Sequence, residues 1–383
     1  MSAAAEIAGS LAAVPDRGVG TDAERRSAIE LAEVIRRPGR RDASLEPFWC
    51  RPNWAMAQAW HTGLGVAGSL VSVSSHWVGA GLLAAALIST FADAFFAVSP
   101  GRRLTREHAS QNVVSPAPGS ASADVRLIIT ANLDAARQGV GRRALSGLTA
   151  RLRSLTGGRA PGWAGWLMLA LALALAAALL RATGTTGTAV KVLQLVPTAG
   201  LVIALALLLE LAAAAWGPGP GDNASGVGVA VALARALDAA PPAHATVELV
   251  LTGAGDGEAI GLSRYLRGHR DRRPSNTIVL GIGPCTGTAT AWLRSDGPLF
   301  PLGYSAILRR LCQQVAGSDP ALGLHELRSR GSSPALAARQ AGIPAVTLTS
   351  QGAPDETATE RVLLVGLALT DAIDAYLGEL RQG

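Results

Sequence analysis

The chain has 383 residues, enough for one large domain or two smaller ones. Hydrophobic residues make up 49% of it and the mean hydropathy is +0.29, which is more apolar than an ordinary soluble protein. The net charge of +6 comes almost entirely from arginines that flank the apolar segments and do not alternate with aromatic residues. We therefore expect a membrane protein with the lipid bilayer as a partner, and we expect no nucleic-acid partner.

The cysteines and the N-terminus exclude two further classes. Cys50, Cys285 and Cys312 are odd in number and lack CxxC spacing, which argues against a disulfide framework and against a thiolate zinc site. Charged residues interrupt every apolar run in the first 45 residues, so we expect no cleaved signal peptide.

The first 99 residues are predicted to form an arm and a membrane hairpin. Residues 1–50 are rich in Ala, Arg and Glu and are expected to be a basic cytoplasmic arm with one short amphipathic helix. Residues 51–99 contain two apolar stretches, one from Trp54 to Val73 and one from Trp77 to Val98. Only three residues separate them, so a tight helical hairpin is expected, although the first stretch is marginal.

A second hairpin is predicted within residues 163–216. Its spans run from Trp163 to Leu180 and from Val192 to Trp216. Eight arginines precede the first hairpin and ten lie in residues 100–162. The loop inside the first hairpin carries no Lys or Arg, and the loop inside the second carries two basic residues. By the positive-inside rule both large polar regions face the cytoplasm of a multi-pass plasma-membrane protein, with the inverted topology as the open alternative.

The two polar regions, residues 100–162 and 217–383, thus lie on one side and can form one domain interrupted by the second hairpin. Buried strands are predicted over residues 124–134, 245–252, 277–282 and 342–348, and a further strand is possible over 322–329. Helices are predicted between them and at 360–380. Alternation of strands and helices predicts an α/β domain with a mixed, largely parallel sheet and helices on both faces.

Five strings then resemble one family in their order and spacing. They are QNVV at Gln111, LIITANLD at Leu127, GDNASGVGVAVALARAL at Gly221, ELVLTGAGDGEAIGLSRYL at Glu248 and GIPAVTL at Gly342. Over roughly residues 108–380, without the second hairpin, the chain resembles the di-zinc aminopeptidases, whose relatives include glutaminyl cyclases and the transferrin-receptor ectodomain. The resemblance implies a mixed α/β sandwich with a metal site at the ends of the central strands.

The resemblance also implies where two zinc ions, about five ligands and a glutamate base would be. The bridging aspartate of the family matches Asp222, and the aspartate that orients the first histidine ligand matches Asp134. The other positions depart from the family pattern. This chain has Asn132 in place of that histidine, Gly255 in place of the base and Asp256 in place of a glutamate ligand. It has Leu280 to Gly283 where the family has a further carboxylate, and Ser333 lies within the string that should hold the last histidine.

Two carboxylates without an imidazole are a poor donor set for catalytic zinc. We therefore expect no catalytic residue, a vestigial metal pair at Asp222 and Asp256, and no cofactor, with zinc bound only if the family activity is retained. The predicted function is a binding or scaffold module for an unidentified protein or peptide partner.

Two alternatives stay open. The first is an active membrane-bound hydrolase whose metal is held by carboxylates alone, from Asp134, Asp222, Asp256 and Glu258, which would favour Mg²⁺, Ca²⁺ or Mn²⁺ over zinc. The second is a transport-related protein, based on Asp93 and Glu210 near the ends of predicted spans, although both are expected to be helix-terminal residues.

Overall fold

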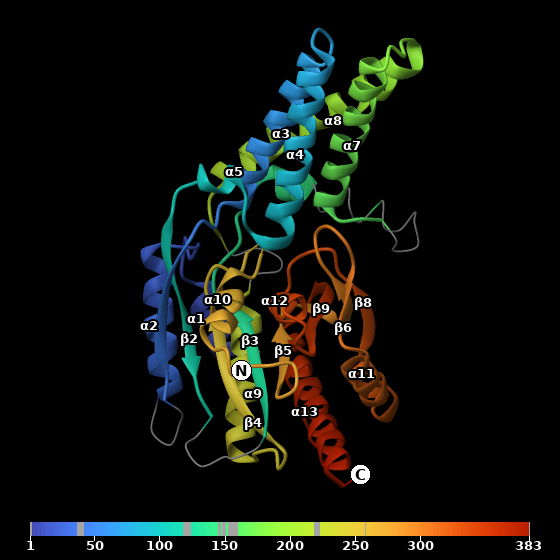
Figure 1. Ribbon diagram of the computed structural model, residues 1–383. Helices are drawn as coiled ribbons and strands as arrows, with labels where there is room; N and C mark the ends of the chain where they lie inside the picture. Colours follow the sequence, from blue (N-terminus) through green and yellow to red (C-terminus); the bar gives the residue numbers. More distant parts are fainter. Residues whose placement is uncertain are drawn as a thin grey trace.

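The structure is a computed structural model that describes residues 2–36, 42–117, 124–144, 147, 151, 160–217, 223–256 and 258–382. An α/β domain lies at one end of a bundle of long helices (Figure 1). Strands from both sides of the second hairpin lie side by side in the sheet of the domain, so the polar regions before and after that hairpin fold together.

The described residues form a sheet of nine strands, and its central four are parallel. These are β4 (Ala245–Thr252), β3 (Val125–Asn132), β5 (Thr277–Ile282) and β9 (Ala345–Pro354). On one side, β2 (His108–Ser115) pairs antiparallel with β4, and β1 (Ser44–Cys50) pairs antiparallel with β2. On the other side, β6 (Gly287–Asp296) pairs antiparallel with β9, and β7 (Leu302–Gly303) pairs antiparallel with β6. The short strand β8 (His325–Arg328) pairs in parallel with β6. The predicted mixed, largely parallel sheet is confirmed.

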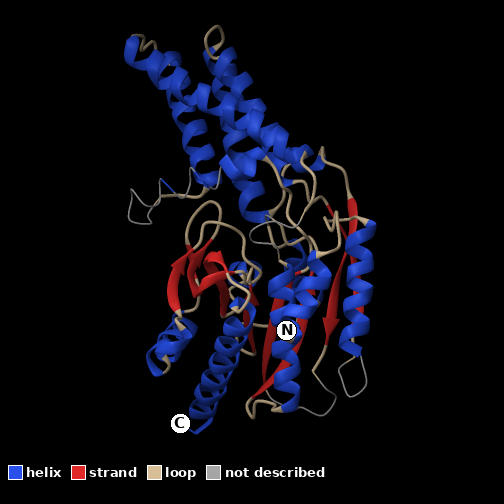
Figure 2. Cartoon of the chain, turned by 180° about the vertical axis from the view of Figure 1, so that it is seen from behind, coloured by secondary structure: helices blue, strands red, loops and turns tan. Residues whose placement is uncertain are grey.

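Side chains alternate between two cores along the central strands, as the pleat of a strand requires. On β3, Leu127 and Ile129 belong to one core and Ile128 to the other. The larger core is covered by α1 (Ala3–Ala12), α2 (Asp22–Arg36), α9 (Ala224–Ala239), α11 (Ala306–Ser318) and α13 (Ala358–Gln382), several of which lie in front of the strands in Figure 2. The smaller core is covered by α10 (Ile260–Gly268) and α12 (Leu336–Gln340), so helices lie on both faces.

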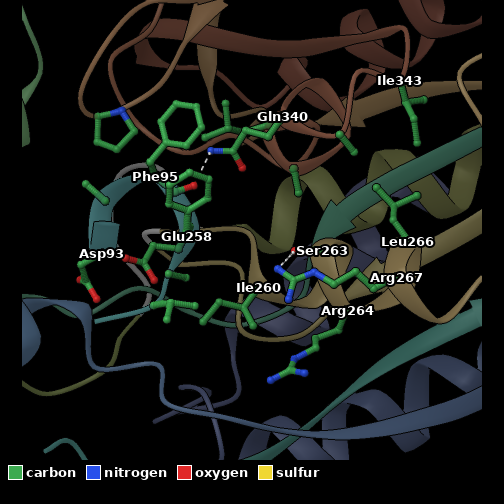
Figure 3. Close-up of a pocket in the computed structure, with 18 of the residues that line it drawn as sticks. Asp93, Phe95, Glu258, Ile260, Ser263, Arg264, Leu266, Arg267, Gln340 and Ile343 are labelled. Atoms are coloured by element: carbon green, nitrogen blue, oxygen red, sulfur yellow. Dashed lines mark hydrogen bonds between the residues drawn. The ribbon is translucent and has the colours of Figure 1, made fainter. Parts of the chain in front are cut away.

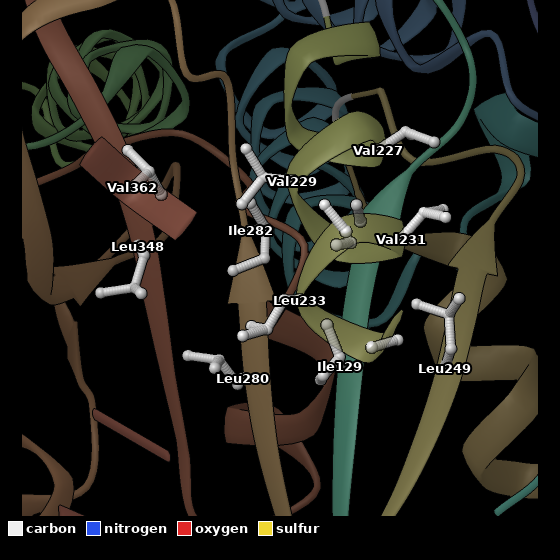
Figure 4. Close-up of a cluster of buried hydrophobic side chains, with 14 of the residues drawn as sticks. Ile129, Val227, Val229, Val231, Leu233, Leu249, Leu280, Ile282, Leu348 and Val362 are labelled. Atoms are coloured by element: carbon white, nitrogen blue, oxygen red, sulfur yellow. The ribbon is translucent and has the colours of Figure 1, made fainter. Parts of the chain in front are cut away.

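Helix α9 is the central helix of the larger core. Its Val229 and Leu233 lie over Ile129, Leu280 and Ile282 of the parallel strands (Figure 4). Sixteen residues of mostly Ala, Val and Leu make this helix apolar nearly all round, which is the composition of a buried helix.

The N-terminal segment packs on this domain, whereas its composition predicts a basic arm. The strand β1 extends the sheet beyond β2, and α1 lies so close to α9 that a Cβ at Gly228 would be 2.2 Å from the Ala4 carbonyl oxygen. Arg17 is 1% exposed and donates hydrogen bonds to the carbonyls of Leu11 and Leu133. These contacts tie the segment to the end of β3.

Four helices form the bundle, at the places where spans were predicted. They are α3 (Trp54–Val71), α4 (His76–Phe96), α7 (Trp163–Ala182) and α8 (Thr188–Ala213). Of these, α4, α7 and α8 are long and apolar enough to span a membrane. Helix α3 packs against α4 and α8 and buries Gln58 and His61, the residues that made it a marginal span in the sequence.

A buried ion cluster joins this bundle to the domain. Arg102, in the short helix α5 (Pro100–Arg103), donates from Nε to Asp93 Oδ1 at 2.9 Å and from Nη2 to Asp93 Oδ2 at 3.0 Å. Its Nη2 also binds Glu258 of the domain. Asp93 is 0% exposed and Arg102 5%, so both charges are held away from water.

Glu210 makes the second polar link, near the end of α8. Its two carboxylate oxygens accept the backbone N–H groups of Val140 and Gly141 at 2.9 and 2.8 Å. Both acids of the predicted spans therefore lie where the bundle meets the domain.

Candidate functional site

A cavity of about 440 Å³ lies where the parallel strands end, beneath the bundle. Its walls include Asn132 at the end of β3, Gly255 and Asp256 after β4, and Ser333 ahead of α12. The carboxyl ends of parallel strands meet at one edge of the sheet, which explains why residues distant in sequence converge here. The volume is within the usual range of ligand pockets.

The bundle forms the roof of this cavity. Trp54 of α3 and Trp163 of α7 line it, with ring centroids 4.8 Å apart, and Leu211 of α8 lies beside them. Together they add aromatic and apolar surface to a cavity that the polar side chains of Asn132, Asp256 and Ser333 also line.

Asn132 and Gly255 share one space in this cavity. A Cβ at position 255 would lie 2.2 Å from Cγ of Asn132, which is far inside van der Waals contact. The Asn132 side chain is fixed by a hydrogen bond from the Thr252 hydroxyl to its Oδ1 at 3.0 Å. A glutamate base at position 255 therefore has no room while Asn132 keeps this position.

Asp134 lies beneath the loop after β4 and shapes it. Its two carboxylate oxygens accept the N–H groups of Gly255 and Asp256 at 2.7 and 2.9 Å, and it is fully buried. Burial and the nearby Asp256 raise its pKa to about 6. Both oxygens are thus occupied by the protein's own backbone.

Glu24 of α2 binds the same loop from the other side, and no motif in the sequence predicts this contact. Its carboxylate accepts the hydroxyl of Ser110 at 2.8 Å and the N–H groups of Gly20 at 2.7 Å and Ala254 at 3.4 Å. Burial and the charge of Asp134 raise the pKa of Glu24 to about 8. The only signal in the sequence was an acid at a buried position of an amphipathic helix.

Asp256 lines the cavity, where it faces a cation. Its Oδ1 lies 3.1 Å from Nη1 of Arg142, and its side chain is only 10% exposed. The guanidinium supplies the positive charge beside this carboxylate.

Ser333 belongs to a hydrogen-bonded network where the family pattern has its last histidine. Its hydroxyl lies 2.6 Å from the Tyr304 hydroxyl and 3.0 Å from the Thr347 hydroxyl, and its N–H donates to Asp296 at 2.7 Å. Burial raises the pKa of Asp296 above its usual range. Tyr304 and Asp296 were not anticipated, because β6, which ends at Asp296, was not predicted.

Two further candidates of the sequence analysis lie elsewhere. Asp222 is outside the described residues; its neighbour Asn223 donates from Nδ2 to the Asp134 carbonyl at 2.8 Å. Glu258 does not line this cavity, since its carboxylate is bound to Arg102 in the ion cluster.

The donors that the structure describes do not converge on one point as the ligands of a zinc centre do. Structural and catalytic zinc ions take three or four His, Cys or carboxylate ligands around one point. In the part of the chain that the structure describes, no three such side chains come together. Asp134, Asp256 and Glu258 each bind protein donors instead, so the described carboxylates of the proposed carboxylate-only site do not form one either.

Comparison with known proteins gives similarity in fold only. No family model matches the sequence, and no curated protein matches it. Among solved structures, a zinc aminopeptidase from Bacillus subtilis is 13% identical, with 96% of this chain and 94% of that chain covered and a TM-score of 0.49. A Fimbriiglobus ruber glutaminyl cyclase is also 13% identical (97% and 93% covered, TM-score 0.48), and a Zn-dependent exopeptidase from Parabacteroides distasonis is 9% identical (98% and 96%, TM-score 0.49). These matches are of the same class as the proteins that the sequence strings resemble.

The contact between Asn132 and position 255 can be tested by a double-mutant cycle. Gly255→Ala should lower the midpoint of thermal unfolding, by the equivalent of about 1–3 kcal/mol, because the new methyl group overlaps Asn132. In an Asn132→Gly background the same substitution should cost much less, because both the Cγ of residue 132 and its Cβ, which would lie 2.5 Å from the new methyl group, are then absent. Gly331→Ala is the control, since it lines the same cavity and its Cβ would meet only an ordinary contact at 3.6 Å. Additive effects in the cycle would contradict the overlap.

The buried Glu24 predicts how stability depends on pH. Its pKa is about 8 in the folded chain against 4.5 for a free side chain, so the folded state binds the proton more tightly. Stability should fall as pH rises from about 4.5 to 8, by up to about 1.4 kcal/mol per pH unit. Glu24→Gln should reduce this slope in thermal unfolding measured across that range. Glu33→Gln, at an exposed position of the same helix, is the control; an unchanged slope in Glu24→Gln would refute the assignment.

Proposed function

We propose that this protein is a membrane-anchored, non-catalytic binding module built on an aminopeptidase-like domain. The observation that carries the proposal is the packing of Asn132 into the space of the residue 255 side chain. This packing supports a site in which Asn132 occupies the space that the side chain of a general base would need. The network around Ser333 supports the same conclusion at the position of the last ligand.

The cavity suits a peptide or a segment of a partner protein. It combines apolar rings from Trp54 and Trp163 with the charged pair Asp256–Arg142 and with backbone groups after β4 and β5. Peptide backbones need donors and acceptors of this kind, and apolar side chains need the aromatic roof. Because the roof belongs to the bundle, a ligand would enter the cavity close to the bilayer.

Membrane anchoring by several helices is the second part of the proposal. The bundle exposes large apolar side chains on its outer surface that only a bilayer or another protein would cover. Examples are Ile88, Leu195, Val196 and Ile203, each more than 60% exposed. The distribution of arginines supports a multi-pass plasma-membrane protein whose domain faces the cytoplasm.

Metal content and hydrolysis together test the absence of catalysis. The full chain, purified in detergent and supplied with zinc, should retain no stoichiometric metal and should not release product from aminoacyl substrates, because the described ligands are bound to protein donors. Metal would be measured by elemental mass spectrometry. Stoichiometric zinc, with turnover abolished in Asp222→Ala, would overturn the proposal and favour an active metallohydrolase.

The side of the membrane can be tested by cysteine labelling in intact cells. Thr185→Cys, in the exposed loop between α7 and α8, should react with an impermeant maleimide from outside. Glu356→Cys, at an exposed position of the domain, should react only after permeabilisation. The native cysteines are buried and give a low background. The opposite pattern would establish the inverted topology.

A further inference from the structure

A second cavity, of about 520 Å³, lies directly beneath the end of α4, between that helix, α10 and α12 (Figure 3). It is separate from the candidate site, because Asn132, Asp256 and Ser333 do not line it. Its lining brings together two kinds of side chain, an aromatic wall and a pair of arginines.

The aromatic wall comes from the last turn of α4. Phe95 and Phe96 line the cavity, with ring centroids 5.0 Å apart, and Leu266 and Ile343 of the domain also line it. Phe96 and the following Val98 are each 57% exposed. Apolar side chains that end a candidate span and stay exposed mark the level at which the bilayer surface would meet the domain.

The two arginines come from α10, and Figure 3 shows them across the cavity from Phe95. Arg264 donates to the Trp49 carbonyl at 3.3 Å, and Arg267 donates to the Ser263 hydroxyl at 2.7 Å. Neither forms an ion pair among the described residues. Among the described residues, no carboxylate oxygen therefore lies within 4.0 Å of either guanidinium.

The remaining charged groups of the cavity are already paired. Arg272 is bound to Glu248 and Asp271. Asp93 and Glu258 lie on the side away from the two arginines, and both are bound by Arg102. An anion that enters the cavity would thus meet a net positive field at Arg264 and Arg267.

We propose that this cavity binds one anionic phospholipid from the leaflet that faces the domain. Its phosphate lies at Arg264 and Arg267, since a guanidinium presents a planar set of donors that matches phosphate oxygens. One acyl chain lies along Phe95 and Phe96, where it removes apolar surface from water. The inference rests on the membrane anchoring in the proposed function, because only a bilayer places this lipid beside α4.

The aromatic wall distinguishes this ligand from a soluble anion. A free phosphate would satisfy the arginines but would leave Phe96 and Val98 exposed. A zwitterionic lipid would cover the wall, but its own cation would compete for the phosphate with the arginines. An anionic lipid satisfies both halves of the cavity.

Native mass spectrometry of the full chain, released from nonionic detergent, tests the proposal. Phosphatidylglycerol and phosphatidylcholine with the same acyl chains are added separately, and the singly bound fraction is measured. Wild type should retain phosphatidylglycerol in preference to phosphatidylcholine. Arg264→Gln/Arg267→Gln should lower this preference about 30-fold, which corresponds to about 2 kcal/mol at about 1.4 kcal/mol per tenfold change.

The matched control is Arg270→Gln/Arg273→Gln, which removes two exposed charges from the same region outside the cavity and should leave the preference unchanged. Equal loss in both double variants, no lipid preference in wild type, or equally tight binding of soluble glycerol phosphate would overturn the proposal. Carbonate extraction of cell membranes is measured in parallel. A chain that stays in the membrane without lipid preference refutes only the lipid site, whereas a chain that is extracted refutes the anchoring itself.

Discussion

The joint between bundle and domain depends on two buried carboxylates that share one guanidinium. Arg102 binds Asp93 at the end of α4 and Glu258 after the loop that follows β4. Removing one member of a buried ion pair leaves an uncompensated charge and commonly costs about 3–5 kcal/mol. The cluster therefore fixes α4 and α5 against the domain, and the packed bundle in turn holds Trp54 and Trp163 over the cavity at the strand ends.

The charges of this cluster balance only if one carboxyl group is protonated. Two acids face one cation, and burial raises the pKa of Glu258 to about 8 even though Arg102 lowers it. Burial therefore favours the protonated form of Glu258, which lowers the negative charge of the cluster. This lower charge matters for the second cavity, because the acids at its inner side then oppose an anion at Arg264 and Arg267 less strongly.

The central elements were predictable because they are buried on both sides. The sequence predicted β4 and β5 with their observed bounds, since continuous apolar runs such as ATVELVLT are typical of the middle of a parallel sheet. The flanking strand β1 was missed because SLEPFWC contains Glu46 and Pro47, which are tolerated at a sheet edge, where only one side of the strand is paired. The position of β1 in the sheet depends on its pairing with β2, which lies about 60 residues later in the chain.

The residues of the candidate site that lie at the ends of parallel strands were predictable from the sequence. The residues that bind them from distant elements were not. Asn132, Asp256 and Ser333 were brought together as expected for residues at one edge of the sheet. Glu24 comes from α2, Asp296 from the end of β6 and Tyr304 from the connection between β7 and α11, so no local spacing in the sequence relates them to the site.

Asp134 has a structural role in the candidate site, because it binds the backbone of the loop after β4. Its carboxylate accepts two backbone N–H groups of the loop after β4, and a hydrogen bond to a charged acceptor commonly contributes about 1.5–3 kcal/mol. Glu24 accepts a third N–H from the same loop, so internal carboxylates determine its shape. A loop held in this way needs no ion for its conformation. The cavity at the strand ends, which Asn132, Gly255 and Ser333 line, is therefore shaped by hydrogen bonds within the protein.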